Sequence, residues 1–524
     1  MQALLFLVLI VPAATAVLLM LFRSSLAVDN SRWVAVCGSA ATLLLSVFLL
    51  ASYYATGPAA LESGREPRAS SAPAEAVIRP KIEYVQPWLD TGRLKIELYF
   101  GIDGISVTMI ALTALLTVSA VLISWEAIRD RAAEFYAALL LLQTGLIGVF
   151  CSFDLLLFYV FFEMTLIPLF FLIAVWGGRD RKWAAVKFFL YTLAGSLVTL
   201  SGLLYLVFYV SSQGVPLKNP TNLPALTAWL KQNPLPEALQ TALFLAVSAG
   251  FLIKVPVFPF HTWLPLAHVE APTAGSIVLA GVLLKLGTYG FLRLCLPLFP
   301  DAAVAIGLPV IGLLSVIGII YGSLCALAQS DIKKLVAYSS IGHMGYILLA
   351  LAAGTPLSLL GSVAQMVSHG LISALLFLLV GFVYNRTGTR DLKVLQGLLT
   401  PERGLPIVGS LMILGVMASS GLPGMMGFMA EFMIFRGSFL AFPRMTLLCM
   451  VGTGLTSVYF LLLVNRAFFG RLTEQFAQME RVKLWEHLPG VVLSLLIVLF
   501  GIQPEWLALW SETAVTTISQ SLPH

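Results

Sequence analysis

Residues 241–260 read TALFLAVSAGFLIKVPVFPF, an apolar run long enough to cross a membrane that nevertheless contains a charged residue, Lys254. A second run, GSIVLAGVLLKLGTYGF at 275–291, has Lys285 in its middle. A helix needs about 20 predominantly apolar residues to cross a bilayer, so both runs are predicted to be membrane spans. The two lysines are therefore predicted to lie at membrane depth.

The rest of the chain has the same character. Of its 524 residues, 59% are hydrophobic and 11% are charged, against about 25% charged in soluble domains. The apolar runs are continuous, which excludes a β-barrel, whose strands alternate with a period of two. The sequence predicts an all-α polytopic membrane protein. Its predicted transmembrane helices, about 14 in number, lie near residues 3–22, 33–54, 104–125, 134–152, 153–176, 184–210, 239–260, 273–296, 303–328, 332–353, 357–384, 405–436, 444–468 and 488–510.

Two acidic residues are placed like the lysines. Glu163 lies in LLLFYVFFEMTLIPLFF and Glu431 in GMMGFMAEFMIF. An ionised side chain at mid-membrane costs about 2.5–3.5 kcal/mol, and such residues usually pair with each other and line an ion or proton path. Glu163, Lys254, Lys285 and Glu431 are therefore the first candidates for function.

Two of the predicted spans contain helix breakers. Pro256 and Pro259 follow Lys254 in the seventh span, and SSGLPG at 419–424 precedes Glu431 in the twelfth. Proline removes a backbone donor and glycine loosens a helix, so helices 7 and 12 are predicted to be discontinuous. Lys254 would then end one half-helix and Glu431 would lie near the start of another, where the helix dipoles favour these charges. Paired breaks five helices apart predict two inverted five-helix repeats, helices 4–8 and 9–13.

We expect a single membrane domain over residues 1–524. Its predicted parts are helices 1–3 at 1–130, the first repeat at 131–298, the second repeat at 299–470, and a C-terminal loop and last helix at 471–524. Residues 55–98 are rich in alanine, proline, serine and charge, which predicts a solvated external loop. The stretch 471–486 is interpreted either as an amphipathic helix on the cytoplasmic surface or as a plain loop.

The distribution of basic residues predicts the orientation. Arginine and lysine are more numerous in the loops after odd-numbered helices, so these loops are expected in the cytoplasm and both termini outside. The net charge of +5 follows from those loops and does not indicate nucleic acid as a partner. The five scattered cysteines form no CxxC pair, and the chain has no nucleotide-binding or nucleophile motif. We therefore expect no cofactor and no metal on this chain.

Two long motifs resemble a known family. KVPVFPFHTWLPLAHVEAPTAGSIVLAGVLLKLGTYGFLR at 254–293 and SDIKKLVAYSSIGHMGYILLA at 330–350 are similar to the antiporter-like proton-pumping subunits of respiratory complex I, NADH:quinone oxidoreductase. The resemblance covers essentially the whole chain. It is strongest to the M-type (chain 4) subunits, because Glu431 stands where the L and N types have lysine and because no long lateral helix follows the fourteenth span. Leu266 departs from the aspartate that the family usually has there, which puts a loop contact in doubt.

The resemblance implies a role for each buried polar residue. Glu163 and Lys254 would form an ion pair on helices 5 and 7, Lys285 would be the central relay lysine, His343 and His369 would be polar connectors on helices 10 and 11, and Glu431 would be the exit-side acid. The relay would translocate protons while quinone reduction takes place elsewhere in the enzyme complex. The implied partners are the other membrane subunits, with L-type and N-type chains on either side, together with lipids and protons. The implied location is the bacterial inner membrane.

Other interpretations stay open. Lys254, Lys285 and Glu163 could form structural salt bridges between helices, and a buried histidine often only bonds a carbonyl. The chain could belong to a multisubunit Na+/H+ antiporter or a membrane-bound hydrogenase. It could also be a scaffold subunit that does not pump.

Overall fold

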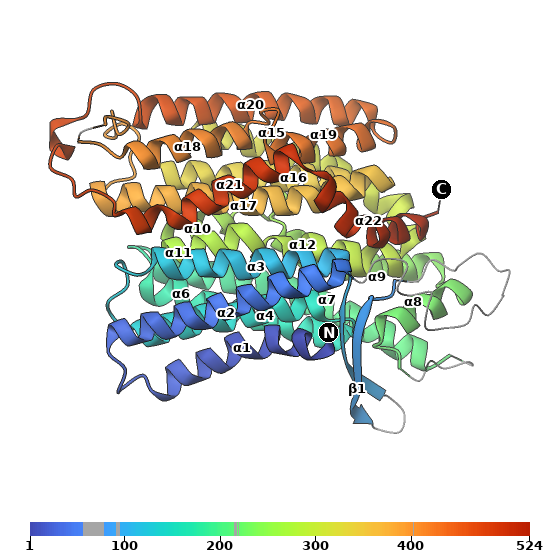
Figure 1. The fold of residues 1–524 in the computed structure, drawn as a ribbon. Helices are drawn as coiled ribbons and strands as arrows, with labels where there is room; N and C mark the ends of the chain where they lie inside the picture. The colour runs from blue at the N-terminus through green and yellow to red at the C-terminus, as the bar shows by residue number, and fades with distance from the viewer. Residues whose placement is uncertain (56–77, 91–94, 214–216, 218, 402, 524) are drawn as a thin grey trace.

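The computed structural model describes residues 1–55, 78–90, 95–213, 217, 219–401 and 403–523. Its helices run along one common direction as an elongated bundle (Figure 1). Among the described residues, 13 helices are long and apolar enough to cross a membrane, and α18 (Pro406–Ser419) is a shorter apolar helix. The predicted helical, polytopic membrane fold is confirmed.

The first part of the bundle is formed by α1 (Gln2–Leu21), α2 (Val28–Ala55), α3 (Gly104–Ile123), α4 (Ala132–Cys151), α5 (Leu155–Met164), α6 (Leu166–Trp176), α7 (Arg181–Ser211), α8 (Leu223–Gln232), α9 (Glu237–Lys254) and α10 (Trp263–Glu270). A central span then combines α11 (Thr273–Val278), η2 (Leu279–Leu283), α12 (Lys285–Gly290), η3 (Phe291–Cys295) and α13 (Leu296–Leu298). The remaining helices are α14 (Pro300–Ala302), η4 (Ala303–Gly307), α15 (Leu308–Leu327), α16 (Ile332–Ala353), α17 (Pro356–Thr387), α18, α19 (Met426–Phe439), α20 (Pro443–Ala467), α21 (Leu488–Ile502) and α22 (Glu505–Gln520).

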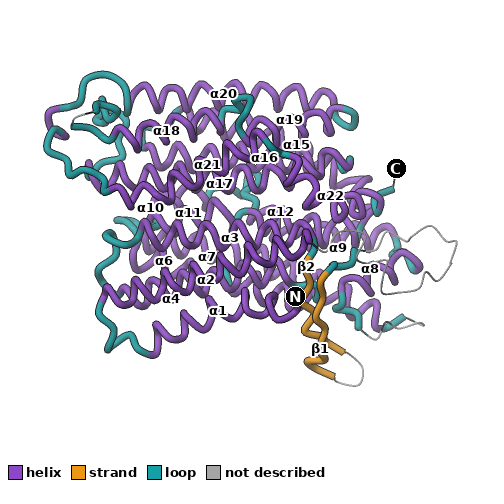
Figure 2. The backbone as a smooth tube through the Cα atoms, viewed as in Figure 1, coloured by secondary structure: helices purple, strands orange, loops and turns teal. Residues whose placement is uncertain are grey.

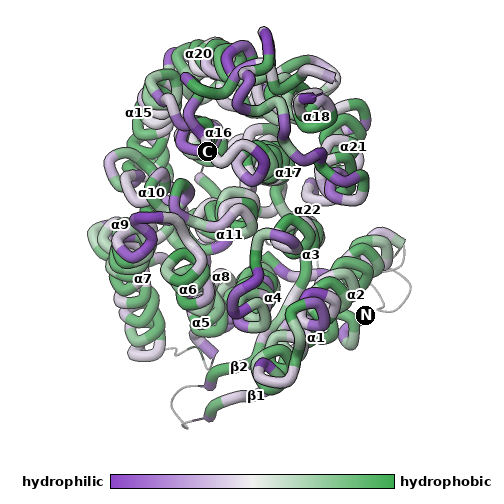
Figure 3. The backbone as a smooth tube through the Cα atoms, turned by 90° about the vertical axis from the view of Figure 1, so that its left-hand side faces the viewer, coloured by the Kyte–Doolittle hydropathy of each residue, from purple (hydrophilic) through white to green (hydrophobic). Residues whose placement is uncertain are grey.

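The most deeply buried spans lie in the middle of the bundle. The central span at 273–298 and α17 are buried along their whole apolar windows, whereas α1, α2 and α20 leave most of theirs uncovered. Apolar residues cover much of the outer helices (Figure 3), as expected for a surface in contact with lipid. A charged side chain on the central span therefore has no route to the lipid headgroups. It must be satisfied by protein groups or by enclosed water.

Three spans are interrupted at membrane depth. α9 ends at Lys254 and α10 begins at Trp263, and α18 ends at Ser419 before α19 begins at Met426. A third interruption, at Thr165 between α5 and α6, was not predicted. Pro168 has no N–H to donate to the carbonyl four residues earlier, which accounts for a break at this point. Irregular backbone at this depth is tolerated only where protein or water surrounds it.

The external segment contains a β-hairpin that was not predicted. Strands β1 (Ile82–Asp90) and β2 (Lys95–Ile102) pair antiparallel, from Ile82 opposite Ile102 to Asp90 opposite Lys95. The hairpin projects from one end of the helical bundle, near both termini (Figures 1 and 2). The expectation of a loop over 55–98 is therefore wrong for the strand residues, and residues 56–77 and 91–94 lie outside the described residues. β-Branched and aromatic residues in IEYVQPWLD and KIELYFGI favour strands, and the composition of the whole segment obscured this signal.

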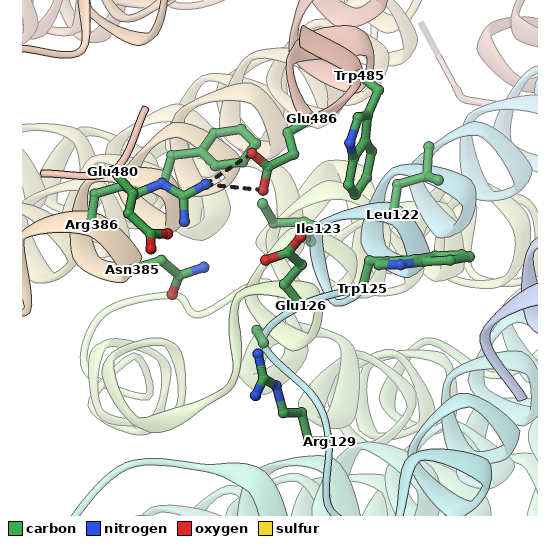
Figure 4. Close-up of a pocket in the computed structure, with 12 residues that line it drawn as sticks. Leu122, Ile123, Trp125, Glu126, Arg129, Asn385, Arg386, Glu480, Trp485 and Glu486 are labelled. Carbon is green, nitrogen blue, oxygen red and sulfur yellow. Dashed lines mark hydrogen bonds and ion pairs between the residues drawn. The ribbon is translucent and has the colours of Figure 1, made fainter. Parts of the chain in front are cut away.

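The segment before α21 is mostly loop. Within it the described helical turns are η5 (Glu474–Phe476) and η6 (Leu484–His487), so the loop interpretation holds over the amphipathic helix. Two ion pairs tie the segment to the ends of α3 and α17. The Lys483 Nζ lies 2.5 Å from Glu126 Oε1, and Arg386 Nη2 lies 2.9 Å from Glu486 Oε2. They border a polar cavity of about 320 Å³ (Figure 4).

Asp154 begins α5 just outside the span. Its Oδ1 accepts hydrogen bonds from the backbone N–H groups of Leu156 and Leu157, at 2.9 and 3.0 Å, which caps the helix. Its Oδ2 is buried and has no hydrogen-bond partner among the described residues. Burial disfavours the charged form and raises the pKa of Asp154 to about 6, against an ordinary value of 3.8.

This raised pKa predicts that the stability of the folded protein depends on pH. The folded protein binds a proton on Asp154 up to about pH 6, whereas the unfolded chain releases it near pH 4. Stability should therefore fall as the pH rises from about 4 to 6, by up to about 3 kcal/mol from this group. Asp154→Asn keeps the cap without the charge. We expect it to raise the thermal unfolding midpoint of the detergent-solubilised protein at pH 7.5 and to change it little at pH 4. An equal effect at both pH values would contradict the assignment.

A buried polar path from Lys285 to Glu431

Lys285 lies at the centre of the bundle, where the helix is irregular. The π-helical turn η2 precedes it, α12 begins at Lys285 itself, and a second π-helical turn, η3, follows. π-Turns inside helices free backbone groups and occur frequently at functional sites. The Lys285 Nζ donates to the Ala280 carbonyl and lies 2.8 Å from Nδ1 of His369. The side chain is fully buried, so these partners take the place of water.

Two histidines continue from Lys285 across the bundle. His369 lies on α17 and His343 on α16, with ring centroids 5.6 Å apart. The Nε2 of His343 is 2.9 Å from the Ser419 hydroxyl, at the point where α18 ends. The Nδ1 of His343 lies 3.6 Å from Oε1 of Glu431 on α19. The structure therefore brings together four of the predicted residues: Lys285, His369, His343 and Glu431.

His343, His369 and Glu431 all border one small cavity. Its lining residues are His343, Gln365, Ser368, His369, Ile372, Ala418, Ser419, Gly427 and Glu431. Its volume is about 10 Å³, close to the space that one water molecule needs. Three buried polar atoms around it, Nε2 of His369, Oγ of Ser368 and Oε1 of Gln365, have no hydrogen-bond partner among the described residues. Polar groups of this kind are normally paired, so the cavity has the size and the donors and acceptors to hold a bridging water.

Glu431 is held at the far end of this path. It lies in the second turn of α19, and its Oε2 accepts a hydrogen bond from Thr453 at 3.1 Å. The Thr453 hydroxyl is also 3.1 Å from the Tyr346 hydroxyl, which belongs to the same helix as His343. The broken backbone at Gly421 approaches closely, since an added Cβ would lie 3.4 Å from Oε2 of Glu431. Two hydroxyl groups thus fix the carboxylate next to the helix break.

Lys254 and Glu163 form a separate group near the other break. The Lys254 Nζ donates to the Phe162 carbonyl at 3.3 Å and to the Thr165 hydroxyl at 3.2 Å, and lies 3.6 Å from the centre of the Phe162 ring. The ion pair expected with Glu163 is therefore not a direct contact here, because the interruption at Thr165 supplies the lysine with other partners. Glu163 lies in the last turn of α5, two residues before Thr165. Its buried Oε1 has no hydrogen-bond partner among the described residues.

A second buried ion pair was not predicted. Arg293, on η3, pairs with Asp103 at the start of α3, and both are almost fully buried. The guanidinium carbon lies 5.1 Å from the ring of Tyr289, which contacts the Ser106 hydroxyl at 3.1 Å. Both charges lie near the ends of predicted spans, so the sequence analysis did not single them out. The available signal was the single arginine within the apolar run FLRLCLPLF.

The described residues contain no group of three histidine, cysteine or acidic side chains that could hold a metal ion. The buried path consists instead of groups that accept and donate protons, namely an amine, two imidazoles, a carboxyl and three hydroxyls. Such groups exchange protons over hydrogen-bond distances or through single waters.

Comparison with known proteins identifies relatives along almost the whole chain. Residues 152–457 match the family described as NADH:quinone oxidoreductase/Mrp antiporter, TM. The chain is 39% identical to NADH-quinone oxidoreductase subunit M of Escherichia coli K12, over 93% of this chain and 92% of that protein. It is 40% identical to subunit M of Rickettsia bellii, over 81% and 83% of the two chains.

Solved structures show the same architecture. A chain of respiratory complex I from Thermus thermophilus, determined with bound NADH, superimposes with a TM-score of 0.85 at 27% identity. The match covers 99% of this chain and 100% of that one. A chain of the Mrp complex from Dietzia has the same fold, with a TM-score of 0.79 at 22% identity over 99% of both chains.

The Arg293–Asp103 pair predicts a non-additive loss of stability. Arg293→Met leaves the buried Asp103 carboxylate without its cationic partner, so we expect a loss of about 3–5 kcal/mol in the free energy of unfolding. Asp103→Asn keeps the helix cap while removing the charge, and the double variant should recover much of the loss. The measurement is thermal unfolding of the purified protein for both single variants and the double variant. Additive effects would show that the two charges do not stabilise each other.

Proposed function

The chain belongs to the NADH:quinone oxidoreductase/Mrp antiporter family, and on that basis we propose that it is the M-type, proton-translocating membrane subunit of an NADH:quinone oxidoreductase. The observation that carries the proposal is the buried polar path from Lys285 through His369 and His343 to Glu431. The path crosses from the central span to α19 through the buried interior of the bundle. Ionisable residues in such positions mark proton relays in membrane proteins.

His369 is placed to pass a proton from Lys285 to the cavity, because its two ring nitrogens face these two partners. The Lys285 ammonium would donate to Nδ1, at 2.8 Å, when the imidazole is neutral with its other nitrogen protonated. The imidazole would then release the proton at Nε2, which lines the water-sized cavity. A water there would carry the proton towards His343 and Glu431. Each transfer leaves a neutral histidine with its proton on Nδ1, so a ring flip or a tautomer exchange through water must restore the Nδ1 acceptor before the next proton.

We propose that the charges of Glu163 and Lys254 control the proton affinity of Lys285. The end of α9 packs directly on the turn after Lys285, because an added Cβ at Gly287 would lie only 2.5 Å from Val255 and 2.7 Å from the Phe251 carbonyl. A positive charge on Lys254 would therefore oppose a positive charge on Lys285. Movement of Glu163 towards Lys254 would neutralise that effect and let Lys285 take up a proton. The arrangement in this structure, in which Lys254 bonds Phe162 and Thr165 instead of Glu163, would be one of the two states of such a switch.

The energy scale is compatible with this switch. Moving one charge against 100 mV requires about 2.3 kcal/mol. Two charges 4 Å apart interact by about 4 kcal/mol at an effective dielectric constant of 20. Making or breaking one such contact can therefore move the proton affinity of the relay by enough to work against a membrane potential. Redox energy from elsewhere in the complex would supply the change.

The partners and the location complete the proposal. We place the chain in the bacterial inner membrane, with L-type and N-type subunits on either side and with flavin, iron–sulfur and quinone chemistry on other subunits. Both termini lie at the hairpin end of the bundle (Figure 1). The larger number of arginine and lysine residues in the loops after odd-numbered helices supports an outer location for the termini. The two interrupted pairs, α9–α10 and α18–α19, support the division into two inverted repeats at 131–298 and 299–470.

Loss of the relay residues should uncouple the complex. We expect Lys285→Ala, and separately Glu163→Ala, to leave assembly intact while NADH-driven proton uptake into proteoliposomes falls at least 10-fold. Lys285→Ala removes the central proton carrier, and Glu163→Ala removes the acid that compensates Lys254. The measurement compares the pH gradient with NADH oxidation by the same purified complex. Lys182→Ala, at an exposed position at the start of α7, is the matched control and should pump normally.

Three outcomes would contradict the proposal. Normal pumping by a Lys285→Ala, Glu163→Ala double variant would exclude the relay. Loss of assembly in both single variants, with the lysine control intact, would favour a scaffold role. Sodium-dependent pH changes in vesicles without NADH would favour a cation/proton antiporter.

The cavity provides an independent test. Ser368→Val fills the space next to His369 with methyl groups and removes one of its polar partners. We expect pumping to fall while NADH oxidation in the presence of an uncoupler persists. Ser373→Val, one turn further along α17 and outside the cavity lining, should have a much smaller effect. Equal effects of the two substitutions would remove the cavity from the path.

A further inference from the structure

A third cavity opens on the outer face of the bundle. It has a volume of about 320 Å³ and lies where α1, α4 and α6 meet. Figure 3, viewed along the bundle, shows α4 between α1 and α6. The floor is made of small residues of α4, Ala137 and Ala138, and the wall includes Ile167 and Phe171 of α6, which are about half exposed. The cavity is therefore an apolar groove on the outer surface of this chain.

One end of the groove is charged. Arg23 and Arg131 both pair with Glu134: the Arg23 Nη1 lies 3.5 Å from Oε1, and the Arg131 guanidinium contacts Oε2. The two arginine side chains are 58% and 60% exposed, whereas Glu134 is 20% exposed. Two guanidinium groups share one carboxylate, which leaves one positive charge and several N–H donors facing outward. Arginine favours bidentate contacts with phosphate, so this end fits an anionic phosphate group.

Trp176 marks the level of the membrane surface at the same end. Its indole N–H donates to the Asp130 carbonyl at 3.0 Å, and the Arg131 guanidinium lies 5.9 Å from its ring. Tryptophan is enriched where hydrocarbon meets headgroups. From Trp176 to Ile167 the groove follows α6 for about 14 Å, at 1.5 Å per residue. That is about half of the roughly 30 Å hydrocarbon core, which is the depth of one leaflet.

Arg131 is held in an unusual conformation. Its backbone φ is 53°, in the left-handed region, although it is not a glycine. Such a conformation costs free energy and persists where the surrounding structure requires it. Here it lets Arg131 precede α4 while its side chain reaches Glu134 and the groove. The charged end is therefore built by the fold rather than by flexible surface side chains alone.

From these observations we propose that the α1–α4–α6 groove binds one anionic phospholipid from the leaflet on the arginine-rich side. The phosphodiester contacts Arg23 and Arg131, and one acyl chain lies over Ala137 and Ala138. Three features favour this occupant over a free anion: the apolar length of the groove, the position of Trp176 and the excess positive charge. A free anion would make no favourable contact with the apolar floor. The proposal does not depend on the relay.

The test uses the purified complex, delipidated in mild detergent and titrated with dioleoyl phosphatidylglycerol or dioleoyl phosphatidylcholine, with native mass spectrometry to count bound lipids. Arg23→Gln combined with Arg131→Gln should weaken phosphatidylglycerol binding about 30-fold, which is about 2 kcal/mol at 1.4 kcal/mol per tenfold. Ala138→Phe, which fills the floor, should abolish retention of that lipid. Arg466→Gln with Arg471→Gln, and Val451→Phe on the exposed face of α20, are matched controls.

The outcomes separate the proposal from its competitors. Loss of one phosphatidylglycerol per chain in both groove variants, with the controls unchanged, supports the site. Equal retention of phosphatidylcholine and phosphatidylglycerol by the unaltered complex would overturn the charge selection. Full retention in the arginine variant and in Ala138→Phe would overturn the site itself. Photo-crosslinking from position 138 to a protein segment of a neighbouring subunit, instead of to lipid, would show that protein fills the groove.

Discussion

The position of Lys285 is the constraint on which the rest of the arrangement depends. Its ammonium group lies on a span with no exposed face, so it can neither reach the headgroups nor remain without partners. The π-turn before it exposes the Ala280 carbonyl, and α17 supplies the ring nitrogen of His369. The central span and α17 must therefore lie side by side with this register. A rotation of either helix would leave a buried amine without its acceptors.

The interrupted helices follow from the same need for polar partners. A continuous helix uses all its backbone groups internally and offers nothing to a buried charge. The break at Thr165 provides a carbonyl and a hydroxyl to Lys254, and the break after Ser419 provides a hydroxyl to His343 and close approach to Glu431. Lys254, His343 and Glu431 thus each lie beside an interruption. The apolar remainder of the bundle keeps these sites separate from lipid.

Sequence reasoning identified the membrane architecture and the ionisable residues, because a charge within an apolar run is visible without a structure. It placed the breaks at Pro256 and at 419–424, where several breakers adjoin. It missed the break at Thr165, since one proline three residues later gave little signal. It did not single out Arg293, because a charge near the end of a predicted span looks the same in sequence whether it is buried or exposed. The resemblance to the family supplied the roles of His343 and His369, which composition alone did not distinguish from structural histidines.

The sequence by itself determined that this chain spans a membrane with mostly apolar helices and that Lys254, Lys285 and Glu431 are buried in them. Hydropathy and chain length decide these points locally, residue by residue. Only the tertiary structure decided which polar groups meet. Lys285 and His369 are 84 residues apart and Ser419 and His343 are 76 apart, so their contacts arise from helix packing. The water-sized cavity beside His343 and His369 likewise exists only where four helices, α16, α17, α18 and α19, converge, because a void is a property of neighbouring surfaces and of no single segment.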